Sequence, residues 1–449
     1  MVWEQIVIIL LDAIYKLKEQ YQQKIAKNPI LKGLFIIGSG TVIAQSISIV
    51  IYPILTRLFT PSDFGIFAVY TSLFSIMIVT ASFRYDFAIP LPKENYKAVN
   101  LMILCIILII GTGFTFLILF TLFKDSIIST FHLESIENYL WLLIISFIGA
   151  GIYQILNAWA IRQRGYFLIT KTLINQNVSG SVVKIVLGYL KFGALGLIIG
   201  DIFSKVTGIG TLFREMWRKE KQVILNEVSL TNIRLFAREY RNFPMYSFPA
   251  SVLNVIALEI PVLMLSYMFD LQVVGWFSLA NVVLSIPLSL ISYSLGQVYC
   301  GEMTIMLREK KGDILELFRS VTKKLFLIGL PIIGIPAIFA PFIFPVIFGS
   351  VWRDAGWFCY PLAIMTIANF CVSATATLGA YGFNYLQLIW DLIRTLSVIS
   401  GFYIAMMLHL PPLQVIFVYA VIMAIYYYIL YHLNIYAIKH REMIPKYVN

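Results

Sequence analysis

Charged residues are scarce in this sequence. They make up 13% of its 449 residues, whereas soluble globular domains carry about 25%, so the composition excludes a chain built of soluble domains. Cysteine and histidine are also rare, with four residues of each. The cysteines fall in apolar stretches without metal-ligand spacing, and the histidines are scattered. We therefore expect neither a disulfide framework nor a bound metal.

Sequence motifs for enzyme chemistry are missing as well. The chain has no P-loop, no glycine-rich dinucleotide turn and no serine, histidine and aspartate set that fits the apolar pattern. It also lacks a long acidic loop of the kind that a membrane glycosyltransferase would need. We therefore expect a protein that is not an enzyme, with no catalytic residues and no cofactor.

Long apolar stretches occupy most of the chain instead. Each holds about 20 or more residues, and at 1.5 Å per residue such a helix crosses a hydrocarbon core about 30 Å thick. The sequence therefore predicts an all-α integral membrane protein with about 12 transmembrane helices. The stretches span residues 33–55, 64–84, 98–123, 139–161, 167–190, 192–213, 243–268, 273–300, 324–348, 356–380, 383–408 and 412–437.

Lysine and arginine lie in every second gap between these stretches. One set of gaps, which includes both chain ends, holds 27 of the 34 basic residues, and the opposite set holds only Arg57, Lys124, Lys191 and Arg353. Cytoplasmic loops of membrane proteins are rich in lysine and arginine. The pattern predicts a multi-pass protein of the inner (cytoplasmic) membrane with both termini in the cytoplasm. It also explains the net positive charge without a nucleic-acid partner.

The two halves of the chain echo each other. Gly65 and its flanking residues match Gly275 and its flanks at an offset of 210, and Gly165 matches Gly382 at an offset of 217. Such a duplication predicts two pseudo-symmetric six-helix lobes around a central cavity, with substrate held at their interface. The predicted parts are an amphipathic cytoplasmic segment 1–31, a first lobe 32–213, a basic cytoplasmic linker 214–240, a second lobe 241–438 and a cytoplasmic tail 439–449.

Polar residues recur at helical spacing on several predicted spans. The stripe on the first span runs from Thr41 through Gln45 to Thr56. In a membrane such a face must contact protein, water or substrate, although small polar residues also permit close helix packing. The candidates for lining the cavity are Gln45, Asn177, Asn254 and Asn281.

Six charged residues lie inside the predicted spans, away from the span ends. Asp201 and Lys205 are four residues apart, and Asp391 and Arg394 are three apart, so each pair can form an ion pair on one helix face. The alternative is that these residues bind substrate or ions. The basic members, Lys205 and Arg394, are candidates for an anionic substrate, and the acidic members are candidates for a coupling Na⁺ or H⁺.

Lys184 and Glu259 complete this set and have no oppositely charged neighbour in sequence. An ionisable residue inside a membrane is costly and usually functional. Lys184 is therefore the foremost candidate for binding an anion, and Glu259 for binding a coupling ion. Glu259 also precedes Pro261 by two residues, where a break in the helix would free backbone carbonyl groups.

Four segments of the sequence carry a family resemblance. They are LTRLFTPSDFGIF at 55–67, RYDFAIPLP at 84–92, RNFPMYSFP at 241–249 and GWFSLA at 275–280. These segments resemble those of bacterial polysaccharide and O-antigen flippases, which belong to the multidrug/oligosaccharidyl-lipid/polysaccharide exporter superfamily. They occur in the family's order, and the likeness extends over residues 33–440.

This resemblance implies a flippase that translocates undecaprenyl-pyrophosphate-linked oligosaccharide repeat units by alternating access, for O-antigen (lipopolysaccharide), capsule or exopolysaccharide biosynthesis. The implied partners are the lipid-linked oligosaccharide, membrane lipids and assembly proteins such as a polymerase or a chain-length regulator. Arg84, in the second segment, is a candidate for facing the pyrophosphate at the cytoplasmic mouth, because a guanidinium suits phosphate oxygens. The alternative is that Arg84 pairs with Asp86 or with lipid headgroups.

Other functions remain open from the sequence. The spans carry three basic and three acidic residues, which weakens the case for a strongly cationic cavity and is compatible with a cation-coupled multidrug exporter of the same superfamily. A membrane glycan polymerase would need long external loops, which are absent. A non-transporting scaffold would not require charges buried in its spans.

Overall fold

The computed structural model describes residues 29–440, except 132, 135–136, 138–139, 310–312, 376–377 and 382. Every regular element in this part of the chain is a helix. The predicted amphipathic segment lies outside the described residues up to residue 28, as does the tail from 441 onward.

Helices of the first half run to the basic connection in mid-chain. The turn between the first two is set locally, because Thr60 and Asp63 form a reciprocal capping box at the start of α3 and Pro61 suits the first helical position. In chain order these helices are α2 (Pro29–Leu58), α3 (Pro61–Val79), η1 (Tyr85–Ala88), α4 (Asn95–Leu122), α5 (Lys124–Phe131), α6 (Leu142–Arg162), α7 (Tyr166–Tyr189), α8 (Ala194–Val206), α9 (Ile209–Glu227) and α10 (Leu230–Glu239).

Helices of the second half include two π-helical turns, η3 and η4. Each of these turns contains a proline, Pro244 or Pro331, which lacks the backbone N–H that a regular α-helix needs. The helices are η3 (Phe243–Ser247), α11 (Phe248–Met268), α12 (Leu271–Glu309), α13 (Ile314–Gly329), η4 (Leu330–Gly334), α14 (Ile335–Phe348), η5 (Ser350–Trp352), α15 (Arg353–Ser373), η6 (Leu378–Tyr381), α16 (Asn384–Met407) and α17 (Pro412–His440).

The structure confirms an all-helical, multi-pass membrane fold. Ten helical segments of the described chain are long and apolar enough to cross a membrane, and Leu271–Ser285 of α12 adds a shorter apolar helix. α7 follows the predicted span 167–190 but is more polar, since it carries Lys171 and Lys184. The predicted span 192–213 is interrupted, because Gly208 adopts φ 95° between α8 and α9.

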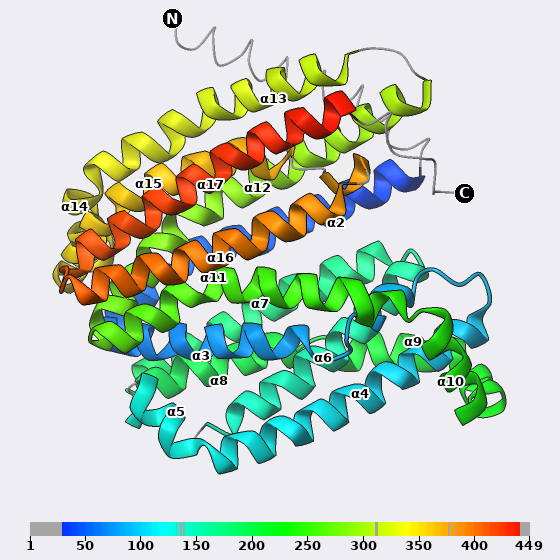
Figure 1. Cartoon of the computed structure of the whole chain (residues 1–449). Helices are drawn as coiled ribbons and strands as arrows, with labels where there is room; N and C mark the ends of the chain where they lie inside the picture. The colour runs from blue at the N-terminus through cyan, green and yellow to red at the C-terminus, as the bar shows by residue number, and fades with distance from the viewer. Residues whose placement is uncertain are drawn as a thin grey trace, which may run out of the picture.

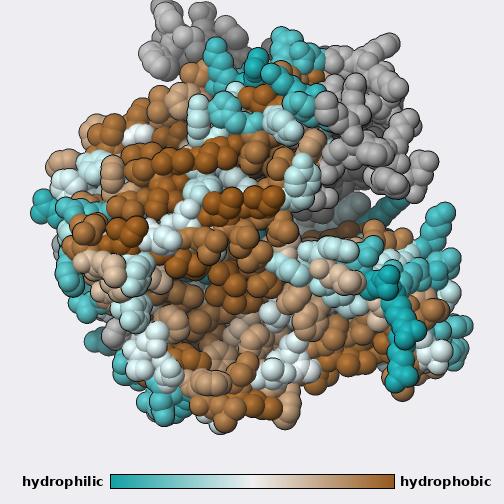
Figure 2. All heavy atoms as spheres, in the orientation of Figure 1, coloured by the Kyte–Doolittle hydropathy of each residue, from teal (hydrophilic) through white to brown (hydrophobic). Residues whose placement is uncertain are grey.

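The helices form two bundles that correspond to the two halves of the chain. In Figure 1 the yellow-to-red helices α13–α17 lie in the upper part, and α3, α4 and α8 lie in the lower part. Figure 2 shows hydrophobic side chains across the middle of this face and hydrophilic ones toward its left and right margins. Exposed apolar residues such as Phe342 and Leu122, each about 70% exposed, are suited to contact lipid rather than water.

The two lobes touch where α3 crosses α12, beside the turns that join α2 to α3 and α11 to α12. We call this the outer end, after the orientation that the basic residues predict. A Cβ atom at Gly65 would overlap the carbonyl oxygen of Leu271, and one at Gly275 would overlap that of Pro61. The two glycines that match in the sequence repeat therefore permit the same close crossing, each from its own lobe.

Further contacts close the outer end around this crossing. The buried Trp352 donates its indole N–H to the carbonyl oxygen of Thr56 over 2.9 Å, and its ring meets the Phe64 ring edge-on at 5.0 Å between centroids. Arg57 donates to the carbonyl oxygen of Val346 over 3.2 Å. These bonds join α2 and α3 to the second lobe, so this conformation is closed at its outer end.

Candidate functional site

Close packing of α7 against α8 brings the charged residues of the first lobe together. A Cβ at Gly180 would lie 2.6 Å from the Cβ of Ser204 and 2.9 Å from the backbone oxygen of Gly200. Small residues allow membrane helices to approach in this way. A Cβ at Gly200 would overlap the side chain of Lys184, so that glycine also makes room for the lysine stem.

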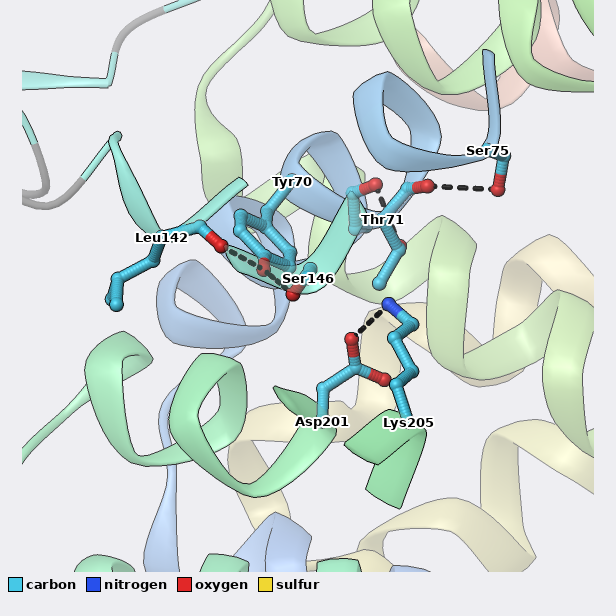
Figure 3. Close-up of polar contacts among 8 residues, drawn as sticks. Tyr70, Thr71, Ser75, Leu142, Ser146, Asp201 and Lys205 are labelled. Atoms are coloured by element: carbon cyan, nitrogen blue, oxygen red, sulfur yellow. Dashed lines mark hydrogen bonds and ion pairs between the residues drawn. The ribbon is translucent and has the colours of Figure 1, made fainter. Parts of the chain in front are cut away.

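Lys184, Asp201 and Lys205 form what we call the lysine cluster. The ammonium of Lys205 donates to the Asp201 carboxylate, so the ion pair expected from their spacing is present. Figure 3 shows Asp201 and Lys205 on α8, with Lys205 extending toward the residues of α3. Asp201 also acts electrostatically on Lys184 of α7. The cluster thus holds two lysines and one carboxylate, of which only Lys205 is paired with it, so its formal charge is positive.

Aromatic rings of α3 cover these ammonium groups. The Nζ atom of Lys205 lies 3.3 Å from the centre of the Phe74 ring, and that of Lys184 lies 4.9 Å from the centre of the Phe67 ring. Cation–π contacts of this kind stabilise an ammonium that is partly removed from water. The side chains of Lys205 and Asp201 are still 18% and 16% exposed. The cluster is sheltered but remains accessible to a ligand.

The second lobe holds a more completely buried pair. Arg394 donates to Asp391 over 2.9 Å on α16, and these side chains are only 3% and 8% exposed. Arg394 also donates to Asn254 of α11 over 3.2 Å, and Gln387 donates to the other Asp391 oxygen. The Nε atom of Arg394 is buried without a hydrogen-bond partner in the described structure. The carboxylate neutralises most of this guanidinium's charge.

Glu259 lies between the lobes. Its carboxylate on α11 accepts a hydrogen bond of 2.7 Å from the buried Ser72 hydroxyl on α3. Within the described residues, no lysine, arginine or histidine forms a salt bridge with it. Glu259 therefore differs from Asp201 and Asp391, each of which has a cation beside it.

Arg84 has an unusual backbone conformation at the end of α3. Phe83 and Arg84 adopt φ values of 47° and 65°, a left-handed conformation that non-glycine residues rarely take and that is enriched at functional sites. The Nε atom of Arg84 is buried without a partner among the described residues, and its guanidinium lies 4.9 Å from the Phe87 ring centre. Asp86 instead accepts from the Ser82 hydroxyl at 2.5 Å. The structure thus shows no Arg84–Asp86 ion pair.

The remaining candidates lie on α2, α7 and α12. Asn177 donates to the carbonyl oxygen of Leu173 on its own helix, and Asn281 is 3.5 Å from the Ser285 hydroxyl on α12. Gln45 is half-buried on α2. In the described part of the chain, no three histidine, cysteine, aspartate or glutamate side chains gather as metal ligands would.

Sequence reasoning missed the residues of α3 that complete the site. Phe67 and Phe74 are seven residues apart and lie on one helix face with Tyr70, whose hydroxyl is 2.5 Å from that of Ser146 on α6 (Figure 3). Ser72 is the partner of Glu259. The aromatic spacing was visible in the sequence, but aromatic residues at helical spacing are typical of any packed core.

Comparison with known proteins gives one family. The model of a family described as "Polysaccharide biosynthesis protein" matches residues 54–356, more than half of the chain. No curated protein matches the sequence.

Solved structures share the fold at low sequence identity. The inward-facing form of a multidrug resistance MATE family transporter of the MOP superfamily has a TM-score of 0.64 and 16% identity, over 91% of this chain and 99% of that one. Its outward-facing counterpart has a TM-score of 0.56 and 17% identity, over 93% and 97%. A MOP superfamily transporter from Pyrococcus furiosus, described as having a binding pocket of reversed polarity, has a TM-score of 0.57 and 17% identity, over 92% of this chain and 97% of that one.

Proposed function

The chain belongs to the polysaccharide biosynthesis protein family, and from this premise we propose that it flips undecaprenyl-pyrophosphate-linked oligosaccharide across the cytoplasmic membrane by alternating access. It is a multi-pass membrane protein whose fold is shared by MOP superfamily transporters. The proposal adds the substrate, the inner membrane and the cytoplasmic location of the termini.

The lysine cluster is the observation that carries this proposal. A diphosphate is an anion, and a cluster of two ammonium groups and one carboxylate offers it an uncompensated positive charge. Both ammonium groups are close to aromatic rings in a half-buried position, where electrostatic attraction is stronger than in water. The polyprenyl tail can remain in lipid while the headgroup passes between the lobes.

Glu259 is our candidate for binding the coupling Na⁺ or H⁺. Asp201 and Asp391 are already paired with basic side chains, whereas Glu259 accepts a hydrogen bond from the Ser72 hydroxyl. An acid without a cation is the better ligand for an incoming ion. Because Ser72 belongs to the other lobe, an ion that displaces this hydrogen bond would change how the lobes are held together.

The second candidate function is a cation-coupled multidrug exporter. Its supporting observation is the same carboxylate, because an acid between the lobes suits a cationic drug as well as a coupling ion. In that case Glu259 would contact the drug and the lysine cluster would be structural. The two functions make different predictions. A flippase should lose glycan export when Lys184 is replaced, whereas a drug exporter should lose drug export when Glu259 is replaced and tolerate replacement of Lys184.

Complementation of a gene deletion tests the proposal. We expect the deletion strain to lose surface polymer and to accumulate single lipid-linked repeats on the cytoplasmic leaflet. Lys184→Ala should fail to restore export although the protein is inserted normally. Lys171→Ala is the matched control, since Lys171 is an exposed lysine on the same helix α7; it should restore export fully.

Three outcomes contradict this expectation. Normal surface glycan in the deletion strain, together with altered resistance to cationic dyes, would favour the exporter. Repeats that accumulate on the outer leaflet would assign polymerisation rather than flipping to this protein. Full export by Lys184→Ala would remove the lysine cluster from substrate binding.

A further inference from the structure

A cavity lies at the outer end, where the short helix α5 of the first lobe meets the ends of α11 and α16 in the second lobe. Its volume is about 500 Å³, within the range of ligand sites in proteins. It is separate from the lysine cluster and shares none of its residues. The polar side chains that line it are Ser129, Thr130, Tyr267 and His409.

The lining of this cavity combines hydrogen-bonding groups with an apolar floor. It offers two aliphatic hydroxyls, one phenol and one imidazole, and Met268 and Phe269 supply the apolar surface. Among the residues that the structure describes, no lysine, arginine, aspartate or glutamate belongs to the lining. This mixture fits a neutral ligand with many hydroxyl groups and at least one apolar face, and it offers a diphosphate no counter-charge.

Backbone groups add acceptors to the same place. Three helices end at the cavity, α5 at Phe131, α11 at Met268 and α16 at Met407. Some carbonyl oxygens of these last turns, such as those of Ala405 and Met406, accept a backbone N–H, but a carbonyl oxygen has two lone pairs and can accept a second hydrogen bond. The hydroxyl groups of a sugar donate to such oxygens. Tyr267 is 53% exposed, so its ring is open for stacking against the C–H face of a pyranose.

The backbone at His409 holds the imidazole at the cavity. His409 adopts φ 49°, its N–H donates to Met406 and the N–H of Leu410 donates to Ala405, which is the hydrogen-bond pattern of a Schellman helix ending. Glycine is the usual residue there because the left-handed conformation strains other side chains. The same ending occurs at Lys191 after α7, away from this cavity.

We infer that this outer cavity binds neutral sugar rings, and that a bound sugar holds the outer end closed. The cavity has walls from both lobes, so separation of the lobes would divide it. A ligand that touches both walls binds only the closed conformation and shifts the population toward it. The inference rests on the proposed function in one respect: the sugar is the glycan part of cargo already delivered to the outer leaflet, which thereby slows further transport.

Sugar binding can be measured without transport. The purified full-length protein in lipid nanodiscs would be examined by saturation-transfer difference NMR with methyl glucoside, methyl N-acetylglucosaminide and maltotriose, and with choline as a cationic probe. We expect transfer to sugar C–H protons at millimolar concentration, at least a fivefold loss in His409→Gly and Tyr267→Ala, and no transfer to choline.

His409→Gly removes the imidazole while relieving the backbone, so its fold should be at least as stable as that of the parent. Lys191→Gly is the matched control, with the same relief of strain outside the cavity, and it should bind sugar normally. Sugar signals that persist in His409→Gly and Tyr267→Ala, or transfer to choline in place of sugar, would overturn the inference.

The conformational part has its own measurement. Spin labels at Lys191 and Arg353, exposed on the outer turns of the two lobes, would report the distance between the lobes. Maltotriose should increase the population of the short distance in the parent and not in His409→Gly. An unchanged distribution in the parent overturns the feedback. The deletion strain tests flipping independently, so failure of either idea is distinguishable from failure of the other.

Discussion

Replacing Gly65 by alanine places a methyl group where the carbonyl oxygen of Leu271 lies. Neither partner can yield as a flexible side chain would, because both belong to helix backbones. Overpacking of this kind costs about 1–3 kcal/mol. Only the conformation closed at the outer end contains the crossing, so the whole cost falls on that conformation. The equilibrium between closed and open outer ends should therefore shift by roughly 5- to 150-fold toward open.

Gly275→Ala should have the same effect from the other lobe, because its Cβ would overlap the carbonyl oxygen of Pro61 in the same crossing. Once one methyl group has separated the helices, the second meets less resistance. The double variant should therefore shift the equilibrium by less than the sum of the single variants, since the residues share one contact.

Spin labels at Lys191 and Arg353, in a background without reactive cysteines, would measure this equilibrium in nanodiscs, and glycan export would be followed in cells. Gly111→Ala is the control, since no atom lies within 4 Å of the Cβ it would introduce. Export and label distances that remain those of the parent in Gly65→Ala would refute the reasoning. So would single effects that add fully in the double variant, because they would indicate two independent sites.

Two further predictions concern individual charges. Arg84→Lys keeps the charge but loses the planar guanidinium, so export of glycan should fall by roughly tenfold. Arg84→Gly relieves the left-handed backbone and should also fail to export. Normal export by Arg84→Gly would mean that only the backbone conformation at this position matters. Asp391→Ala leaves the Arg394 guanidinium buried without its carboxylate and should lower the free energy of unfolding by about 3–5 kcal/mol. Thermal unfolding in detergent would measure this loss, and the double variant Asp391→Ala with Arg394→Met should regain most of it. An unaltered melting temperature in Asp391→Ala would contradict the buried pair.

The membrane helices could be predicted because their signal is local. A stretch of about 20 apolar residues identifies a span without knowledge of its neighbours, and the i,i+4 spacing of Asp201 and Lys205 was enough to predict their ion pair. Helix interruptions were harder to foresee. Gly208 is a common residue type in membrane helices, and its effect at this position depends on what packs beside it.

Contacts between helices could not be derived from one sequence. Ser72 and Glu259 are 187 residues apart, and Asn254 and Arg394 are 140 apart, so no spacing rule connects them. The sequence repeat identified Gly65 and Gly275 as equivalent. Only the structure shows that the two glycines meet, because each makes room for the other's helix where α3 crosses α12.

The distribution of charge decides how substrate and coupling ion could act on each other. The spans contain equal numbers of basic and acidic residues, but the fold pairs Arg394 with Asp391, leaves positive charge in the lysine cluster and leaves Glu259 without a cation. α3 contacts both of the unbalanced sites, through Phe67 and Phe74 at the lysines and through Ser72 at the carboxylate. In the proposed flippase, an anion at the lysine cluster and a cation at Glu259 would therefore both change the contacts of α3. That helix also forms the closing contact at the outer end, so occupancy of either site can change the energy of closure without a direct contact between the two ligands.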